Sequence, residues 1–399
     1  MGYDVIIVGA GPAGSAAAIS LSRSGARVLL LEKKRFPREK LCGEYITPAC
    51  IPLMEKLGVL SGALKREANV IRVARFISHR GAQLDVPLSQ LPSGGAFGLG
   101  LSRSAFDELL LRQAQRSGAE VIEEFQATQP IADGKRITGI EGRLKGSPRK
   151  VSFSGSVVID ASGRAAALAR SGQLRQPRKQ IKEKRIAFKA HFSDADSIDD
   201  RVELYFYPSG YGGLSRIENG LANLCFITDQ AQLRAAGGDP MKLIETTILR
   251  NEIARERLRG AKLEGEWLSA ASLHFGRSVP ASSSLLAIGD AYLPIDPFTG
   301  EGIYVALRSG LIAGRIVERG LAAGAPYDEM AANYMAAHRK EFSERFKACA
   351  LLRRAAYFPG LANLLIVASE KNSKLAQIII RATHSEKLFR QATGSFQEK

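Results

Sequence analysis

The chain has 399 residues, 45% of them hydrophobic, which is enough for two domains or one elaborate domain with a large core. Lys and Arg number 56 against 40 Asp and Glu, so the formal net charge is +16, and this charge favours anionic partners. The basic residues are spread along the chain and form no recognisable module with stacking aromatics. We therefore expect no nucleic-acid partner.

Cysteine and histidine usage excludes several kinds of site. The four cysteines are widely separated, which argues against a disulfide framework, an iron–sulfur cluster or a zinc site. The five histidines show no spacing typical of metal ligands, so we expect no bound metal. The apolar stretches are too short for a membrane span and the first residues do not resemble a secretory signal, so the expected location is the cytoplasm.

The first elements predict a dinucleotide-binding unit. Residues 4–8 form an aliphatic run typical of a buried parallel strand, GAGPAG follows at 9–14, and residues 15–23 favour a tightly packed helix. The next strand ends at Glu32, at the spacing used to bind an adenosine ribose. The candidate cofactor-binding residues here are Gly9, Gly11, Pro12, Ala13, Gly14, Glu32 and Lys33.

Later segments alternate between two kinds of pattern. Residues 103–123, 151–164 and 284–317 continue the nucleotide-binding core, whereas 71–88 and 185–228 alternate apolar and polar residues, as half-buried antiparallel strands do. We therefore predict an α/β fold (α+β overall): a Rossmann-type domain, an inserted antiparallel β-sheet domain and a helical C-terminal tail. The expected bounds are 1–70, 98–165 and 275–340 for the first domain, 71–97 and 166–274 for the second, and 341–399 for the tail, with a helix break at Pro359–Gly360.

A second helix N-terminus distinguishes the expected cofactor. In GDAYLPIDPFTGEGIYVALRSG, Asp290 ends a strand and Gly300 and Gly302 lead into a helix, which creates another site for negative charge. One such site fits the phosphates of a dinucleotide, and the second suits the anionic edge of a reduced flavin. This favours FAD over NAD. The candidate cofactor-binding residues here are Gly289, Asp290, Gly300, Glu301, Gly302 and Ile303.

Together these motifs resemble the FAD-dependent geranylgeranyl reductase family, within the superfamily of aromatic hydroxylases and flavin halogenases. The resemblance rests on GAGPAG with Glu32, PREKLCGE (37–44), LSRSAFD (101–107), DASG (160–163) and the segment 289–310. It implies that Glu32 binds the adenosine ribose, Arg103 the pyrophosphate, Asp290 the ribityl chain and Gly300–Gly302 the flavin pyrimidine edge. It adds Asp160 and Gly163 as cofactor-binding residues and makes 185–228 the floor of a substrate chamber.

Departures from the superfamily patterns narrow the reaction. DASG stands where the hydroxylases usually have Asp-Gly, and is closer to the reductases and halogenases. Halogenases carry a WxWxIP helix, but this chain has one tryptophan, Trp267, so halogenation is not expected. No second GxGxxG is present, so the expected electron source is a transiently bound NAD(P)H or a separate reductase.

Candidate catalytic and substrate-binding residues follow from the same loops and strands. The family's CGE-type loop approaches the flavin, so Cys42 and Glu44 are candidates for proton delivery or substrate contact, although a buried thiol and a solvated loop acid are equally open. Pro297 is a third catalytic candidate. His191, Tyr205, Tyr207 and Tyr211 are candidates for lining a hydrophobic chamber, with packing of the sheet as the alternative.

Three functions are compatible with these residues. The favoured one is hydroxylation of a lipophilic phenol or polyketide with reduced FAD and oxygen. Saturation of isoprenoid C=C bonds and a non-enzymatic flavin-binding electron carrier are the alternatives. Residues 340–390 interleave apolar clusters with Lys and Arg, so they predict either peripheral contact with an anionic membrane or helices that close the chamber. The sequence leaves the oligomeric state open.

Overall fold

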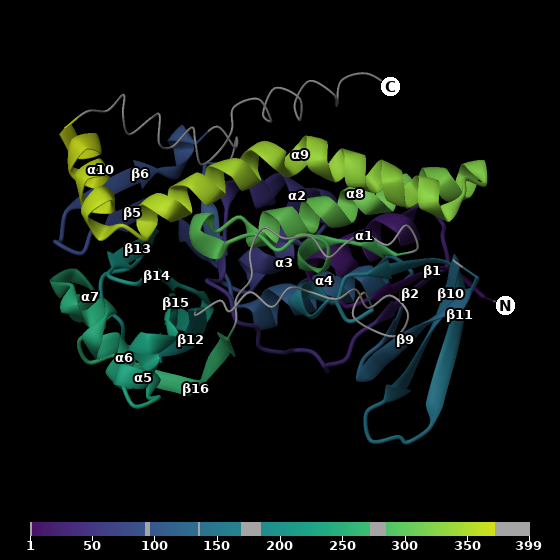
Figure 1. Cartoon of the computed structure of the whole chain (residues 1–399), viewed down its shortest axis with the longest axis horizontal. Coiled ribbons are helices and arrows are strands. Elements are labelled where there is room, and N and C mark those ends of the chain that lie inside the picture. The colour runs from purple at the N-terminus through teal and green to yellow at the C-terminus, as the bar shows by residue number, and fades with distance from the viewer. Residues whose placement is uncertain (1, 92–95, 135, 169–184, 272–284, 372–399) are drawn as a thin grey trace.

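The computed structural model describes residues 2–91, 96–134, 136–168, 185–271 and 285–371 (Figure 1). Parts of the predicted domains, at 169–184 and 272–284, lie outside the described residues, as does the predicted tail from 372 onward. Within the described chain, two seven-stranded sheets and one three-stranded sheet are connected by helices.

The first sheet is the predicted nucleotide-binding sheet, with an unpredicted antiparallel extension. Its order is β8-β2-β1-β11-β10-β9, with β17 paired to β11. The strands are β1 (Tyr3–Val8), β2 (Val28–Leu31), β8 (Glu120–Ile122), β9 (Phe125–Asp133), β10 (Arg136–Leu144), β11 (Lys150–Asp160) and β17 (Leu286–Ala287). Residues 155–160 of β11 run parallel to β1, whereas 150–154 pair antiparallel with β10, so β11 belongs to both parts.

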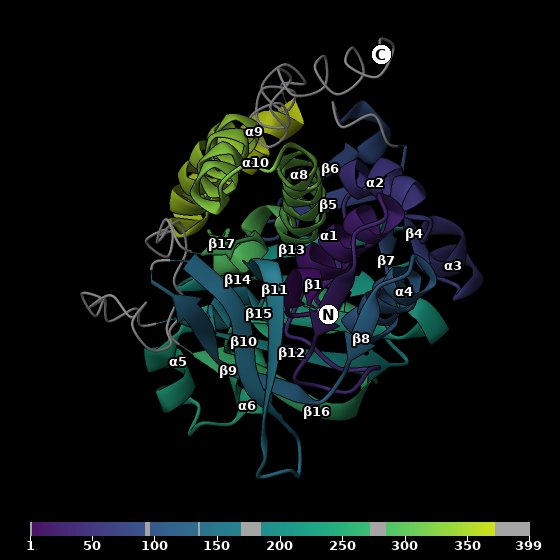
Figure 2. The ribbon, with the colours of Figure 1, turned by 90° about the vertical axis from the view of Figure 1, so that its right-hand side faces the viewer.

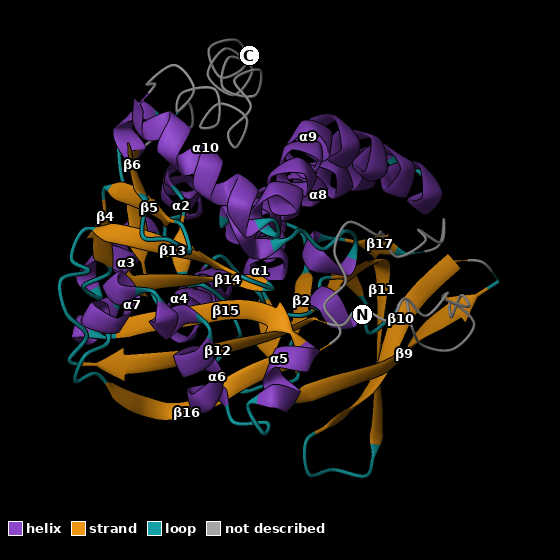
Figure 3. Ribbon diagram, turned by 60° about the vertical axis from the view of Figure 1, so that its left-hand side comes forward, coloured by secondary structure: helices purple, strands orange, loops and turns teal. Residues whose placement is uncertain are grey.

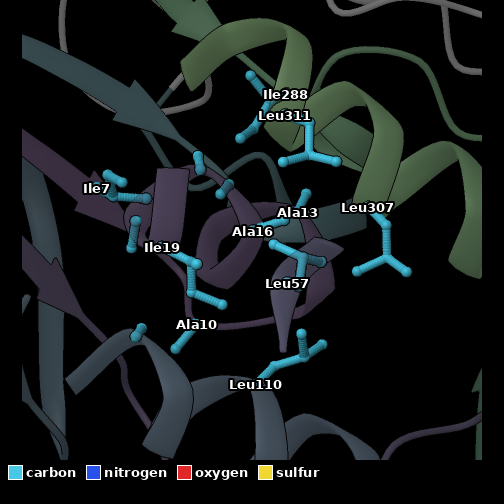
Figure 4. Close-up of a cluster of buried hydrophobic side chains, with 14 of the residues drawn as sticks. Ile7, Ala10, Ala13, Ala16, Ile19, Leu57, Leu110, Ile288, Leu307 and Leu311 are labelled. Carbon is cyan, nitrogen blue, oxygen red and sulfur yellow. The ribbon is translucent and has the colours of Figure 1, made fainter. Parts of the chain in front are cut away.

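Helices α1 (Pro12–Arg23) and α8 (Gly302–Ala323) pack tightly beside this sheet, and Figure 4 shows their buried side chains around Ala13 and Leu311. The contact depends on glycines in α8. A Cβ at Gly310 would lie 2.3 Å from the Ala13 carbonyl oxygen, and one at Gly314 would lie 2.8 Å from Ser20 Cβ. Helix α4 (Arg103–Arg116) also packs against α1. The alanine-rich face of α1 is thus buried between two helices.

The second sheet is built from chain segments far apart in sequence. Its order is β16-β12-β15-β14-β13-β5-β6. The strands are β5 (Val73–Ile77), β6 (Gln83–Pro87), β12 (Arg185–Ser193), β13 (Arg201–Tyr207), β14 (Gly210–Arg216), β15 (Ala222–Asp229) and β16 (Lys262–Ala271). The sheet is antiparallel, as predicted, except at one pair, where β5 runs parallel to β13. More than 100 residues separate these two strands, so no hairpin forces them to be antiparallel.

Both faces of the four central strands are covered, so β12, β13, β14 and β15 are more buried than the half-buried alternation predicted. The strands β5, β6 and β16 stay half-buried or exposed. One face carries Phe188, Tyr205 and Phe226, which are at most 4% exposed and pack with Leu243 and Ile244. Those leucine and isoleucine side chains come from the helical segment of α5 (Gln230–Ala235), α6 (Pro240–Thr246) and α7 (Glu252–Arg257) (Figure 3). The opposite face meets the nucleotide-binding part.

A small sheet and two C-terminal helices complete the described structure. The small sheet joins β3 (Tyr45–Ile46), β7 (Gly98–Gly100) and β4 (Asn69–Ile71), with α2 (Ile51–Leu57) and α3 (Leu60–Lys65) between them in sequence. Helix α9 (Tyr327–Ala356) packs along α8, and α10 (Pro359–Lys371) contacts β6 and β13 (Figures 1 and 2). The predicted break lies slightly earlier than expected, at residues 357–358, and Pro359 begins α10. No described helix is long and apolar enough to cross a membrane.

Candidate active site

The first glycine motif forms the cradle that its sequence predicts. Gly9 has φ +107°, and a Cβ there would lie 2.4 Å from the Ala161 carbonyl oxygen. A Cβ at Gly14 would lie 1.9 Å from the Gly9 carbonyl oxygen, so the α1 N-terminus can approach the strand only without a side chain. At Gly11, the N-cap, a Cβ would meet only Arg38 Nη2 at 3.9 Å. The space above this helix N-terminus is therefore open to a phosphate group.

Glu32 lies where a ribose-binding acid is expected, at the end of β2, and is 5% exposed. Its carboxylate accepts hydrogen bonds from Ala10 N at 2.9 Å and Lys34 N at 3.0 Å. The same side chain thus also fixes the turn after β1. Lys33 follows it as an exposed residue, whereas Pro12, Ala13 and Ile303 are buried and contribute their side chains to packing.

Three cations gather beside this cradle. Arg103 binds Asp107 through two hydrogen bonds of 2.7 Å, and Arg38 Nη1 lies 3.0 Å from the same carboxylate. Lys40 keeps solvent contact, yet protein groups surround it, and this loss of hydration lowers its pKa to about 8, with Arg103 and Arg38 acting in the same direction. The excess positive charge suits a pyrophosphate. Arg38 and Lys40 were not predicted.

The DASG turn and the GDA turn meet at the end of the parallel strands. Asp160 is buried and accepts hydrogen bonds from Ser162 N, Ser162 Oγ and Leu168 N, so its carboxylate shapes the turn. Gly163 has φ +71°. Asp290 is partly exposed and lies 3.3 Å from Arg164 Nε, where it remains available to a ligand hydroxyl. A Cβ at Gly289 would lie 2.9 Å from Ala13 Cβ, so this turn closes against α1.

The loop before α8 is held against the second sheet. Tyr211 donates a hydrogen bond of 2.7 Å to Asp296, and the rings of Tyr211 and Phe298 meet edge to face at 5.2 Å. Gly300 has φ +70°, and a Cβ there would lie 3.0 Å from a ring carbon of Tyr45. Pro297, the third catalytic candidate, is exposed at the start of this turn. The loop thus forms one wall between the two sheets.

Glu301 differs from its predicted role in one respect. Its side chain is fully buried and pairs with Arg345 of α9, which is 5% exposed. The carboxylate therefore connects the start of α8 to α9 and does not extend towards a cofactor. Only the backbone of Glu301, together with Gly300 and Gly302, stays a candidate for contact with the flavin.

A buried charged cluster forms around Glu44, and it joins two predicted residues to two that were missed. Glu44 is 0% exposed and has φ +54°, a left-handed backbone unusual for a residue with a side chain. Its Oε1 accepts hydrogen bonds from Arg103 N at 2.7 Å and Lys189 Nζ at 2.6 Å, and its Oε2 lies 2.6 Å from His191 Nε2. Lys189 also donates to Glu39 at 2.6 Å.

The side chains of this cluster are of types that can bind a metal ion, but here they form a network of ion pairs. Atoms of Glu39, Glu44 and His191 lie within 4.8 Å of one another. The Lys189 ammonium bonds to both carboxylates and occupies the space between them. Burial acts to lower the pKa of Lys189, but Glu44 and Glu39 together raise it above its ordinary value, so the lysine is cationic here.

Cys42 lies at the edge of this cluster. Its Sγ accepts a hydrogen bond of 3.4 Å from Glu44 N, and its carbonyl oxygen accepts one of 3.3 Å from Asn223 of β15. Cys225, two residues along β15, is partly buried, and burial first, then the nearby Cys42, raises its pKa. A strand with Lys189 and His191 two residues apart, in an otherwise buried run, is the signal that could have found this polar face.

Two of the predicted chamber residues point the other way. Tyr205 and Tyr207 are 1% and 3% exposed and pack against the α5–α7 side, with the Tyr207 hydroxyl bonded to the Ile227 carbonyl oxygen at 2.8 Å. Their alternation with Leu204 and Phe206 was identified correctly, but the prediction that the tyrosines line the chamber is wrong. Side chains of the α5–α7 segment cover the face that carries these tyrosines, and the sequence of β13 alone gives no sign of them. Tyr211 and His191 do face the nucleotide-binding part.

Known proteins resemble the chain in sequence and fold. The family model described as FAD dependent oxidoreductase matches residues 4–207, just over half of the chain. The chain belongs to this FAD-dependent oxidoreductase family. A digeranylgeranylglycerophospholipid reductase of Methanocella arvoryzae is 28% identical over 329 residues, covering 81% of this chain and 79% of the relative. A menaquinone reductase of Mycobacterium tuberculosis is 28% identical over 340 residues, covering 79% and 76%.

A solved flavin-dependent brominase shares the fold of this FAD-dependent oxidoreductase, with a TM-score of 0.79 and 21% identity over 99% of both chains. The predicted resemblance to the geranylgeranyl reductases and the prediction of an enzyme are confirmed, which sets aside the non-enzymatic carrier. FAD is the family's cofactor, and the open space at Gly11, the nearby cations and the Gly300 turn fit its two ends.

Proposed function

We propose that this FAD-dependent oxidoreductase saturates a C=C bond in the isoprenoid chain of a lipophilic substrate. Reduction of such a bond adds a hydride to one carbon and a proton to the other. Reduced FAD, when bound, supplies the electrons as hydride, so the protein must hold a proton donor at the same place. The similarity to the digeranylgeranylglycerophospholipid reductase of Methanocella and to the menaquinone reductase of Mycobacterium supports this class of reaction.

The observation that carries the proposal is the Glu44–His191 pair. Because Glu44 Oε1 already accepts from Arg103 N and Lys189 Nζ, the carboxylate is fixed and its Oε2 holds His191 through Nε2. Nε2 then donates to Glu44, and in the imidazolium form Nδ1 carries the proton that is transferred, which leaves the neutral ring with Nε2–H still bound to Glu44. His191 is thus the acid in this proposal and Glu44 the residue that orients it, by the logic of carboxylate–histidine pairs.

Hydroxylation of a lipophilic phenol or polyketide is the second candidate. The same pair supports it, because His191 Nδ1 in its unprotonated form can accept the proton of a phenol. The two reactions differ in their need for oxygen and in the product mass. The electron source proposed for either is NAD(P)H or a separate reductase.

Anaerobic single turnover separates the two reactions. The FAD-loaded protein is reduced with dithionite and mixed with geranylgeraniol as an isoprenoid probe, and products are analysed by mass spectrometry. Reductase chemistry adds two hydrogens without oxygen. An unchanged probe under these conditions, together with an oxygen-dependent gain of one oxygen atom by an alkylphenol, would overturn the reductase proposal in favour of hydroxylation. NADPH and NADH replace dithionite in a second series to test the electron source.

We also propose that α10 contacts an anionic lipid surface, from which a lipophilic substrate is taken up. Phe358, Leu361 and Leu364 are 65%, 43% and 63% exposed and recur every three residues. Leu361 and Leu364 are one turn apart on α10, and Phe358 directly precedes the helix, with its carbonyl oxygen bonded to Ala362 N. The chain's net charge of +16 adds attraction to anionic headgroups.

A further inference from the structure

One row of residues crosses the second sheet on the face that meets the nucleotide-binding part. Direct pairing in the register places Lys189 next to Cys225 and Cys225 next to Gly213. The row continues from Gly213 to Leu204. It then passes to Phe76 and Leu84, at the β6 edge of the sheet. Residues paired in this way lie side by side on one face.

The row changes character along its length. At the Lys189 end it adjoins Glu44, His191 and Asn223, which form the polar cluster described above. Beyond Gly213 every member is apolar. Figure 3 shows that α10 lies over the β6 end of the sheet, and the hydrogen bond of 2.8 Å between Ser78 and Asn363 fixes it there.

Solvent reaches this row although the central strands of the sheet are covered on both faces. Cys225, Gly213, Leu204, Phe76 and Leu84 are all partly exposed. Their neighbours on the opposite face are closed: Leu224 is 0% and Tyr205 1% exposed. Leu204, Phe76 and Leu84 pack in the cluster of Ala362 and Ile366 of α10, and the apolar surface that they leave accessible is available to a ligand.

At Gly213 the row has no side chain, and the space for one is open. A Cβ built there would meet nothing nearer than two backbone oxygens at 3.9 and 4.0 Å. By contrast, a Cβ at Gly212, on the other face, would lie 2.7 Å from Ile248 Cδ1. The glycine at 213 is therefore not demanded by packing, and its missing side chain leaves room directly above the sheet, between the polar cluster and the apolar half of the row.

We infer that this row is the binding track for the hydrocarbon chain of the substrate. The chain lies over Gly213 and extends along Leu204 and Phe76 to Leu84 under α10, with the reacting end at the Glu44–His191 cluster. Gly213 sets which chains can pass from one half to the other. This assignment deepens the proposed function, on which it rests for the location of the reacting end.

The test measures binding without turnover. Geraniol, farnesol and geranylgeraniol, with 10, 15 and 20 carbons, are titrated into the oxidised FAD holoenzyme, and Kd is read from the change in flavin absorbance. Burial of additional methylene groups predicts a fall in Kd of at least about tenfold for each five-carbon unit, and of up to several hundredfold where the unit is fully buried. Gly213→Leu is expected to abolish this gain while Kd for geraniol changes by less than about threefold. Gly213→Ala is expected to give an intermediate series.

Further variants keep the test decisive. Leu204→Trp fills the apolar half from another strand and is expected to repeat the loss, should Gly213→Leu fail to retain FAD. Leu204→Ala removes contacts without blocking the track and should preserve the dependence on chain length. Equal affinities for the three alcohols in the native enzyme, or an equal loss for all three in Gly213→Leu, would overturn the inference. Chain-length-dependent binding combined with failed anaerobic reduction would retain the track and refute the reaction.

Discussion

Replacement of Glu44 by Gln tests the charged cluster most directly. The change keeps the shape of a side chain that is 0% exposed and removes its charge. An amide has one acceptor oxygen, so it cannot satisfy Arg103 N, Lys189 Nζ and His191 Nε2 in the present arrangement. At least one of these contacts becomes donor against donor, and the Lys189 cation loses its buried partner.

The size of the stability loss depends on the contacts that Lys189 keeps in the Glu44→Gln variant. Loss of one partner of a buried ion pair costs about 3–5 kcal/mol. Lys189 keeps a 2.6 Å contact with Glu39, whose side chain is 45% exposed, so the low end, about 3 kcal/mol of unfolding free energy, is expected. Because His191 loses its orienting carboxylate, the rate of the reductive single turnover should fall about 100-fold or more. Retention of FAD should change little.

Guanidinium unfolding followed by the single tryptophan measures the stability term. Trp267 packs edge to face with Phe188 at 6.3 Å and Phe226 at 5.9 Å, so its fluorescence reports on the second sheet. Lys189→Met provides the matched control in a double-mutant cycle, since removing both charges leaves no buried ion without a partner, and Glu39, which loses Lys189, is 45% exposed. We expect a coupling free energy of about 2 kcal/mol. Additivity to within about 0.5 kcal/mol would refute the reasoning.

Three further perturbations have distinct outcomes. Gly11→Val adds a side chain where only Arg38 Nη2 lies near, so we expect the fold to persist while FAD occupancy is lost. The control variant Gly360→Ala also adds a side chain in open space and should retain FAD. Full FAD retention by Gly11→Val would contradict the phosphate site. Burial lowers the pKa of His338 from 6.5 to about 4, so the folded state binds fewer protons than the unfolded state between these values and stability falls as pH drops. The free energy of unfolding should fall by about 2 kcal/mol from pH 7 to pH 5, and denaturant titrations of His338→Phe should show a smaller fall. If the variant shows the same dependence of stability on pH, then His338 is not its cause. Sedimentation with anionic vesicles should show binding at low salt that falls at high salt and with Leu364→Ser; absence of low-salt binding would remove the proposed lipid contact.

The sequence was sufficient to predict those parts of the structure in which the functional residues lie close together along the chain. Gly9, Gly14 and Glu32 lie in the turn after β1, in the first turn of α1 and directly after β2, all within 24 residues of sequence, from 9 to 32. Helix starts and the alternation of β13 were likewise local. These parts of the fold and of the FAD site could therefore be predicted before any long-range contact was known.

The remainder depends on partners far away in sequence. Alternation shows that Tyr205 and Tyr207 share a face, but which face is covered depends on Leu243 and Ile244, which have no signal in β13 itself. The contact of Glu44 with Lys189 spans 145 residues, and no periodic pattern within either segment implies it. Strand β9 is mostly exposed, and the two buried isoleucines of β10, Ile137 and Ile140, are three residues apart across a register shift, so no simple apolar alternation revealed this pair.

The chain passes more than once between the two large sheets, and this has a consequence for folding during synthesis. Strands β5 and β6 precede residue 88. Within the described residues they join their sheet through β13, which is completed at residue 207, and β17 joins the first sheet near residue 287. During synthesis, β5 and β6 therefore emerge well before the strands that cover their hydrogen-bonding edge. Pairings of such sequence separation fold slowly and expose edges that invite aggregation. We expect that neither sheet can be excised as an autonomous folding unit, and that truncation of the nascent chain before β13 yields a chaperone-dependent product.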